Sequence, residues 1–308
     1  MNTDAIFTSF EGDYHLGVAA LLNSAIRAGF KGDFHVFHRG QLPDWTSQFE
    51  KYTPDRFSIS NVSLYFHRSS RSRHFGYDKP FQALEIFEQF DHVESLFYFD
   101  PDVVILSPWV FFGEWVTRGV GLVMDCNAPI VPFNHPWRFK WRELALSIAK
   151  PEDASGIEPF CANSGFFCLQ RKHRGFLDVW KAITDRFEEA GGDTQAFHLD
   201  QRWQGVTGDQ DLLAASTQAW DGPLSYVGPD GMGFNGHYWL LSHATERPKP
   251  WRRICIKEAL KGHPPKRTVG MYLDCANGAV RTLSQLSHLV RSLDYRLGRG
   301  IGCYWRRP

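Results

Sequence analysis

The stretch LFYFDPDVVIL, residues 96–106, places two carboxylates inside an otherwise apolar run. An unpaired charge in such surroundings is costly unless a cation compensates it. Side chains at i and i+2 of an extended segment point to the same side, so Asp100 and Asp102 can reach one hard cation. Pro101 favours an extended backbone at Asp100. A bare Asp-X-Asp pair more often marks a polar turn, but the apolar flanks favour a strand that ends at a divalent-metal site.

The composition leaves room for one large α/β domain, or for one domain and a small appendage. The chain has 308 residues and is 43% hydrophobic, which allows a sizeable core. Lys and Arg together number 34, as do Asp and Glu, so no global field favours nucleic acid and we expect no such partner. The six cysteines are scattered without a Cys-x-x-Cys pair, which indicates reduced thiols rather than a disulfide framework or a zinc site.

The start of the chain has no visible signal peptide, and the reduced thiols favour a cytoplasmic protein. Residues 1–4 lack the basic region of a signal peptide and lead directly into a strand-like segment. No run approaches the roughly 20 apolar residues that span a bilayer. We therefore expect a soluble protein that is at most peripheral on the inner face of a membrane.

Strand-like and helix-like patterns alternate through the first half of the chain. This alternation predicts an α/β fold with a mostly parallel sheet flanked by helices, in which ligands bind at the carboxyl ends of strands. The predicted elements are strands at 5–9, 34–38, 121–124 and 165–169 beside the acidic strand 96–106, and helices at 16–28, 79–90 and 176–189.

The end of the chain differs in composition from the rest. Arg, Lys and Pro become frequent from Pro248 onward, and leucines recur at helical spacing from Leu283 to Leu297, interleaved with arginines. The predicted organisation is therefore a main domain at 1–252 and a basic C-terminal extension at 253–308 with an amphipathic helix. Such a helix can lie on an anionic membrane surface, or it can pack on the domain with its arginines in solvent.

Four further motifs accompany the acidic stretch. They are the segment from Thr8 to Tyr14, Asn163-Ser164-Gly165, the run GDQDLL at 208–213 and the run HATERPKPW at 243–251. With these motifs in this order, the chain resembles the GT-A-fold glycosyltransferases over residues 4–252. The resemblance is strongest to glycosyltransferase family 8, the glycogenin and bacterial galactosyltransferase type. It implies a nucleotide-diphospho-sugar transferase fold.

The resemblance implies a metal site and a phosphate contact. In that family the Asp-X-Asp pair and a later histidine bind manganese, and a lysine six residues beyond the histidine reaches the donor diphosphate. The matching residues are Asp100, Asp102 and His243 for Mn²⁺ or Mg²⁺, and Lys249 for the diphosphate. Two carboxylates and a neutral imidazole leave positions open for two phosphate oxygens. Taken alone, His243 is more typical of a hydrogen-bonded core histidine.

The resemblance also implies residues that contact the donor sugar. Asp209 and Gln210 match the pair beside the anomeric carbon, and Asn163 and Asp125 match residues that bind sugar hydroxyls. Sequence alone leaves other interpretations open. Asp209 is also a suitable helix N-cap, and Asp125 a suitable turn residue.

Three more donor contacts follow from the resemblance. Thr8 and Tyr14 stand where the family binds the nucleotide base, and Lys79 precedes the acidic strand and can face the phosphates or the sugar, although a solvated helix lysine is the more frequent case. The chain departs from the family where Glu246 replaces a glycine. No residue clearly matches the acidic residue that reads uracil, so the base stays open.

These expectations together predict a metal-dependent, hexosyltransferase-like enzyme. It transfers a sugar from a nucleotide-sugar donor, a UDP-sugar, to a hydroxyl of a saccharide or glycolipid acceptor, with retention by front-side displacement. Residues 132–142 are the candidate acceptor segment, or an ordinary packing segment. A non-catalytic sugar-nucleotide or glycan-binding protein on the same fold is the alternative. A nucleotidyltransferase ranks last, because residues 8–17 lack the Lys or Arg that would hold a triphosphate.

Overall fold

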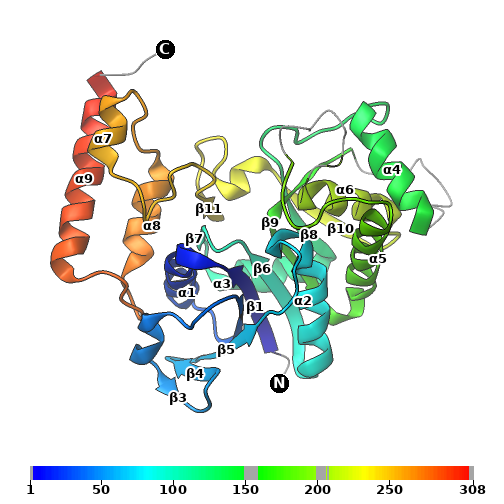
Figure 1. The fold of residues 1–308 in the computed structure, drawn as a ribbon, viewed down its shortest axis with the longest axis horizontal. Helices are drawn as coiled ribbons and strands as arrows, with labels where there is room; N and C mark the ends of the chain where they lie inside the picture. Colours follow the sequence, from blue (N-terminus) through cyan, green and yellow to red (C-terminus); the bar gives the residue numbers. More distant parts are fainter. Residues whose placement is uncertain (1–2, 149–158, 199–205, 207, 305–308) are drawn as a thin grey trace. The chain divides into compact units, whose positions relative to one another are not determined.

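The computed structural model describes residues 3–148, 159–198, 206 and 208–304. The fold is α/β, with a mixed, mostly parallel sheet flanked by helices (Figure 1). The chain divides into two compact units. The first unit consists of Met1–Phe7, Ser69–Phe99 and Phe111–Pro229, and the second unit consists of Thr8–Arg68, Asp100–Val110 and Asp230–Pro308.

The strands of the first unit follow the order β10-β8-β9-β6-β1. Strand β6 pairs in parallel with β1 and antiparallel with β9, and β8 pairs antiparallel with β9 and in parallel with β10. Four strands therefore run in one direction and β9 runs in the other. Their bounds are β1 (Thr3–Phe10, of which 3–7 belong to this unit), β6 (Val93–Phe99), β8 (Val120–Met124), β9 (Ala162–Gln170) and β10 (Leu224–Val227).

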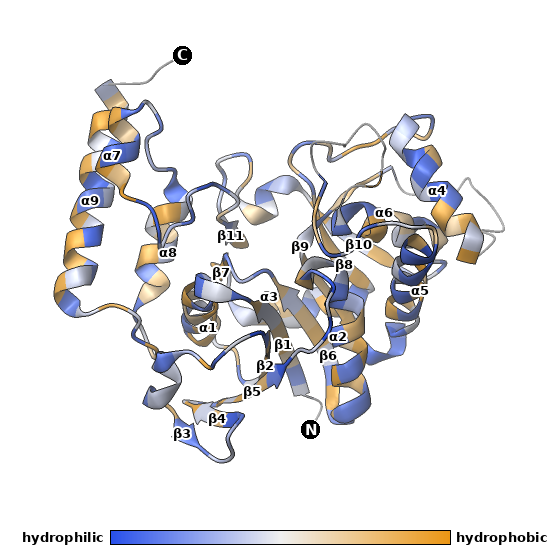
Figure 2. Cartoon of the chain, in the orientation of Figure 1, coloured by the Kyte–Doolittle hydropathy of each residue, from blue (hydrophilic) through white to orange (hydrophobic). Residues whose placement is uncertain are grey.

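Helices accompany this sheet and close an aromatic core. Phe7, Phe97 and Phe167 are fully buried, and hydrophobic residues continue along β6 (Figure 2). An unbroken apolar run is typical of a strand that is covered on both faces. The helices are α2 (Phe75–Gln89), α3 (Trp109–Trp115, which begins in the second unit), α4 (Pro136–Ile148), α5 (Gly175–Glu189) and α6 (Asp209–Ala219).

The second unit has its own strands and a separate ribbon. Strands β2, β5, β4 and β3 are neighbours in that order, with β2 and β5 parallel and the other pairs antiparallel. Strands β7 and β11 form a two-stranded antiparallel ribbon. Their bounds are β2 (Gly32–His38), β3 (Glu50–Lys51), β4 (Arg56–Ile59), β5 (Val62–Arg68), β7 (Val103–Ile105) and β11 (Leu241–His243).

The second unit also contains α-helices, four of which lie wholly within its described residues. Helix α1 ends at Gly29, whose φ of 93° is a left-handed conformation that glycine adopts without penalty. Trp251, Tyr272 and Leu273 belong to one buried cluster with residues of α1 and β7. The helices are α1 (His15–Ala28), α7 (Cys255–Leu260), α8 (Arg267–Ala276) and α9 (Gln285–Tyr304).

Helix α9 packs through a narrow polar and glycine face. The Asp294 carboxylate accepts the backbone N–H groups of Cys255 and Ile256 and so caps the start of α7. Gly298 and Gly302 continue this face, and a Cβ at Gly302 would lie 2.3 Å from the Cβ of Pro264. Only glycine allows so close an approach.

The leucine row of α9 is not the packing face. Leu286 and Leu297 are 72% and 58% exposed, and Leu289, Val290 and Leu293 are also exposed. The alternative in which the helix packs on the domain is supported, because α9 contacts α7 and α8, but the contact uses a face other than the leucine row. The predicted amphipathic helix is confirmed, although Trp305 to Arg307 lie outside the described residues.

Most elements with strong hydrophobic periodicity are confirmed, with bounds that differ by one to four residues. The acidic stretch is the main correction, because 96–106 is not one strand but contains the end of β6, a turn and β7. The predicted boundary between 252 and 253 stays a prediction, and α7 to α9 belong to the same compact unit as residues 8–68. Among the described residues, no helix is both long and apolar enough to cross a membrane.

Candidate functional site

The Asp-Pro-Asp segment is a turn and not an extended strand. The backbone N–H of Val103 donates to the carbonyl of Asp100 at 3.0 Å, which closes a four-residue turn. Pro101 occupies its second position, where the fixed φ of proline is favourable. The expectation that Asp100 and Asp102 lie on one extended segment is therefore wrong. The turn itself brings the Asp100 and Asp102 side chains together.

The β7–β11 ribbon brings His243 to this turn. In the antiparallel register His243 lies opposite Val103, and the N–H of Ala244 donates to the carbonyl of Asp102 at 2.9 Å. A residue late in the sequence is thus held beside the acidic turn by backbone pairing. Only the second unit supplies these groups.

The geometry of Asp100, Asp102 and His243 fits a divalent cation. One ligand atom from each lies within 4.8 Å of the others. His243 Nε2 is 3.2 Å from Asp102 Oδ1 and 3.7 Å from Asp100 Oδ2. Adjacent ligands around an ion with bonds of about 2.2 Å lie about 3 Å apart. Two carboxylates and an imidazole are a donor set suited to Mn²⁺ or Mg²⁺.

Lys249 completes the charge balance of this group. Its Nζ donates to Asp102 Oδ2 at 2.5 Å and to the carbonyl of Ala244 at 2.8 Å. Burial would raise the pKa of Asp102, but the charges and hydrogen bonds of His243 and Lys249 outweigh burial, so the pKa lies below its usual value. Asp102 therefore stays ionised and uses one oxygen for Lys249 and the other toward His243.

Gly17 is a contributor that the sequence reasoning missed. A Cβ at this position would lie 2.1 Å from the carbonyl oxygen of Pro101. Any side chain on α1 at this point would push the acidic turn away. A glycine inside an otherwise apolar helix was the available signal, because glycine there costs helix stability and needs a packing reason.

The two residues expected near a nucleotide base also lie in the second unit. Thr8 is fully buried, and its hydroxyl has no hydrogen-bond partner among the described residues. The Tyr14 ring stands edge-on to Trp251, with centroids 5.1 Å apart. Trp251 is the last residue of the HATERPKPW motif.

A second group of predicted residues gathers in the first unit around a buried ion pair. Lys79 Nζ donates to Asp209 Oδ2 at 2.7 Å and to the carbonyl of Ser164 at 2.8 Å, and lies 4.7 Å from the centre of the Tyr98 ring. The alternative of a solvated lysine is wrong. Burial would raise the pKa of Asp209, but the charge and hydrogen bond of Lys79 hold it below its usual value.

Asp125, Asn163 and Gln210 form a connected network in the same unit. The Asn163 side-chain amide donates to Asp125 Oδ1 at 3.2 Å and to Gln210 Oε1 at 3.3 Å. The other Asp125 oxygen accepts the backbone N–H groups of Asn127 and Ala128, which makes Asp125 a turn residue as well. The network holds three polar side chains in fixed orientations.

Helix α6 positions Asp209 and Gln210 at its start. Gly208, not Asp209, is the N-cap residue, and the N–H of Gly208 donates to the Asp211 carboxylate at 3.2 Å. The prediction that Asp209 caps the helix is therefore wrong. Its carboxylate is instead directed to Lys79.

The segment at 132–142 is partly helical, because α4 begins at Pro136. Trp141 is buried and donates to Asp211 Oδ1 at 3.2 Å, and Arg138 is buried and donates to the carbonyl of Val131. Phe133 and Phe139 are exposed. Part of the segment thus packs on the first unit, and part remains available for contacts.

Comparison with known proteins identifies the fold. The architecture is that of the GT-A-type glycosyltransferases, although no protein-family model and no curated protein matches the sequence. Similar solved structures include the glycosyltransferase GlyE of Streptococcus pneumoniae, with a TM-score of 0.53 and 10% identity over 98% of this chain. The galactosyltransferase LgtC, solved with donor and acceptor sugar analogues, has a TM-score of 0.54 and 13% identity over 92% of this chain and 98% of its own.

A third similar structure is the bifunctional glycosyltransferase WbbM, with a TM-score of 0.52 and 13% identity over 95% of this chain. The chain spans 64% of the GlyE structure and 52% of the WbbM structure. The TM-scores show a shared fold. Because the identities are low, the donor, the acceptor and the mechanism have to be argued from the residues of this chain.

Proposed function

We propose that the protein is a metal-dependent glycosyltransferase that moves a sugar from a nucleotide-diphosphate donor, a UDP-sugar, to an acceptor hydroxyl. One observation carries the proposal. On a fold of the GT-A type, one ligand atom each of Asp100, Asp102 and His243 lies within 4.8 Å of the others. Lys249 donates a hydrogen bond to the Asp102 carboxylate of this group. An anion-binding lysine beside a cation-binding cluster suits a diphosphate.

The second unit would hold the leaving group. Asp100, Asp102 and His243 would hold Mn²⁺ or Mg²⁺, which stabilises charge on a departing nucleoside diphosphate when bound. The Lys249 ammonium donates to one oxygen of Asp102. It can also pair with a phosphate oxygen while the Asp102 carboxylate still balances the charge of the lysine. Tyr14 and Thr8, whose buried hydroxyl has no partner in the described part of the chain, are the proposed contacts to the nucleotide base.

The first unit would bind the donor sugar. Asp125 and Asn163 have hydrogen-bonding groups suited to sugar hydroxyls, and Gln210 presents an amide oxygen beside Asn163. Asp209 is paired with Lys79 at 2.7 Å and buried, which makes it a poor nucleophile. With the retention that the family resemblance implies, this favours front-side displacement, in which the leaving phosphate oxygen accepts the acceptor proton, over a double displacement through Asp209.

A saccharide or glycolipid acceptor is the second part of the proposal. Exposed Phe133 and Phe139 are candidate contacts to its sugar rings. The exposed leucine row of α9, with eleven Lys and Arg against three acidic residues in 253–308, suits the inner face of an anionic membrane. We therefore propose a cytoplasmic enzyme, peripheral on that face.

A screen of nucleotide sugars for Mn²⁺-dependent hydrolysis and transfer tests this proposal. We expect one donor to be turned over by the wild type and not by Asp102→Asn, which keeps the size of the side chain. The exposed Asp274 supplies a matched control, and Asp274→Asn should retain full activity. Full activity of Asp102→Asn would refute the mechanism. Mn²⁺-dependent stabilisation by UDP without turnover of any donor would favour a non-catalytic sugar-nucleotide-binding protein.

A further inference from the structure

A cavity of about 760 Å³ lies in the second unit, apart from the residues assigned above. It is bordered by Gly236 and Tyr238, residues 246–247, the loop at 262–267 and the last turns of α9. His243 and Lys249 do not line it. Its charged lining consists of Arg247, Arg253, Lys266, Arg267 and Arg299, with Glu246 as the only carboxylate among the lining residues.

The ion pairs leave most of this positive charge uncompensated. Glu246 pairs with Arg253 at 3.3 Å and with Lys266 at 3.4 Å. No residue in the described ranges forms an ion pair with Arg247, Arg267 or Arg299. The whole chain is electrically neutral, so the charge of this cavity is a local concentration. Like charges that surround one cavity repel each other unless an anion lies between them.

Arg253 gives an independent indication of a missing partner. Its side chain is 4% exposed, donates from Nη2 to the carbonyl of His263 at 2.8 Å and faces Glu246 through Nη1. Its Nε has no hydrogen-bond partner among the described residues. Buried donors are almost always satisfied by protein, water or ligand, so this arginine on the cavity wall keeps one donor that no described residue satisfies.

The walls of the cavity are held in place. The close approach of Gly302 to Pro264 fixes α9 against the loop at 262–267. Arg267 lies over the Tyr238 ring at 5.6 Å, and Arg299 donates to the Tyr295 hydroxyl at 3.3 Å. A preformed wall with oriented guanidinium groups reduces the ordering cost of binding.

We propose that this cavity binds the phosphate group of a phosphorylated ligand the size of a sugar phosphate. Guanidinium groups present paired N–H donors that match phosphate oxygens, and the volume lies within the range typical of small-molecule sites. The phosphate monoester can belong to a soluble sugar phosphate or to a lipid headgroup. The proposal does not depend on transferase activity.

Calorimetric titration with glucose 6-phosphate, with glucose as the uncharged control, tests the site directly. The titration is done with a chelator present, so that metal-bound phosphate does not contribute. We expect glucose 6-phosphate to bind and glucose not to bind. Arg299→Ala and Arg267→Ala should each weaken binding about tenfold or more, because each removes a charge-assisted hydrogen bond.

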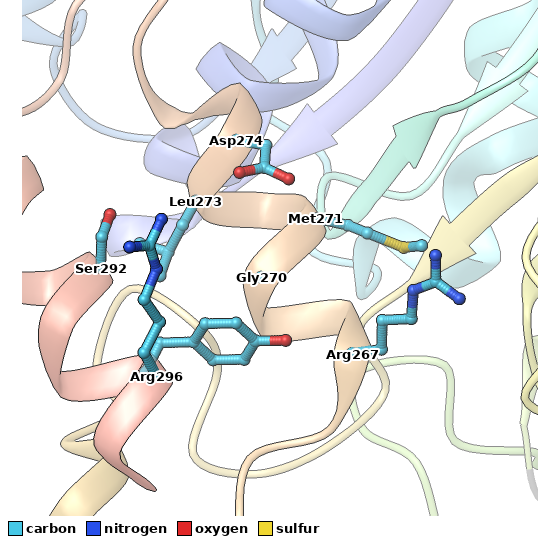
Figure 3. A pocket seen from close by; sticks show the side chains of 8 residues that line it. Arg267, Gly270, Met271, Leu273, Asp274, Ser292 and Arg296 are labelled. Carbon is cyan, nitrogen blue, oxygen red and sulfur yellow. The ribbon is translucent and has the colours of Figure 1, made fainter. Parts of the chain in front are cut away.

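Arg296 supplies the matched control. It lies on α9 three residues before Arg299 and lines a smaller cavity of about 300 Å³, which shares Arg267 with the larger cavity but not Arg299. In Figure 3, Arg296 and Arg267 lie on opposite sides of Gly270. Arg296→Ala should bind glucose 6-phosphate as the wild type does. An equal loss in Arg296→Ala, or unchanged binding in both Arg299→Ala and Arg267→Ala, would overturn the proposal.

Vesicles distinguish the source of the phosphate. Binding to phosphatidic acid vesicles and not to phosphatidylcholine vesicles, with loss in Arg299→Ala and not in Arg296→Ala, would assign a lipid headgroup. Binding of glucose 6-phosphate without any Arg299-dependent vesicle binding would assign a soluble ester. Absence of binding to both phosphate probes contradicts the site. A failed donor screen would leave this result untouched.

Discussion

Replacement of Lys79 by methionine should destabilise the first unit strongly. The side chains of Lys79 and Asp209 are only 3% and 10% exposed, and their charged atoms are 2.7 Å apart. Methionine keeps the length of the side chain and removes the charge, so the Asp209 carboxylate would stay buried without its cation. Most of the expected loss of stability comes from the uncompensated charge of Asp209, and less comes from the loss of one hydrogen bond.

Removal of one partner from a buried ion pair costs about 3–5 kcal/mol of the free energy of unfolding. The Lys79 ammonium also donates to the Ser164 carbonyl and lies over the Tyr98 ring, which places the expected loss near the upper end of that range. The double variant Lys79→Met/Asp209→Leu removes both charges. It should lose much less than the sum of the single variants, with a coupling of about 2–3 kcal/mol.

The sign of the pH dependence follows from the direction of the pKa shifts. In the wild type the pKa of Asp209 is lowered by Lys79, so the contribution of the pair is present at neutral pH and is lost as pH falls through the folded-state pKa. In Lys79→Met, burial without a cation raises the pKa of Asp209. Protonation of Asp209 then removes the buried unpaired charge of the variant. The difference in the free energy of unfolding between the wild type and the variant should therefore narrow as pH falls from 7 toward 5.

Equilibrium urea unfolding followed by circular dichroism and fluorescence measures these differences. Lys181 is the control, because it is 45% exposed and pairs with Asp185 at 2.8 Å in the same unit. Lys181→Met should cost less than about 1 kcal/mol. A loss below about 1 kcal/mol in Lys79→Met at pH 7 would refute the reasoning, and so would a gap that does not change with pH.

Three further predictions concern the second unit. Mn²⁺ at about 100 times its Kd should stabilise the wild type by about 2.7 kcal/mol, and thermal shifts should show this gain reduced in His243→Ala but kept in the exposed control His237→Ala. Gly17→Ala should displace the Pro101 carbonyl, which a Cβ would approach to 2.1 Å, and should weaken Mn²⁺ binding in the same assay; equal Mn²⁺ affinity would contradict the role of that glycine. Asp294→Ala should remove the cap of α7 and cost about 1 kcal/mol in urea unfolding, and no measurable loss would count against the capping.

The sequence predicted elements that carry their own signal. The apolar run that contains Phe97 and the helix that ends at Gly29 needed no knowledge of distant residues, because burial on both faces and a left-handed cap are local properties. The meeting of Asp100 and Asp102 was also predicted, but for the wrong local reason. Proline fits an extended segment and the second position of a turn equally well, so Pro101 could not separate the two.

Contacts between segments that are far apart in the sequence were harder to predict from the sequence. The partnership of Lys79 and Asp209 joins residues 130 positions apart, and neither side chain has a local feature that names the other. Helix α9 shows the same limit, since its leucine periodicity predicted a helix but not which face packs. The glycines at 298 and 302 decide that face, and their spacing became informative only when the contact with Pro264 was known.

The β7–β11 ribbon has a consequence for when the proposed cation site forms during synthesis. The acidic turn leaves the ribosome long before residues 241–249, so a nascent chain carries two of the three proposed cation ligands without the imidazole and without the lysine that balances them. Tight ion uptake would therefore mark the moment when the late strand docks onto the early one. A growing chain would be protected from premature capture of metal until that docking occurs.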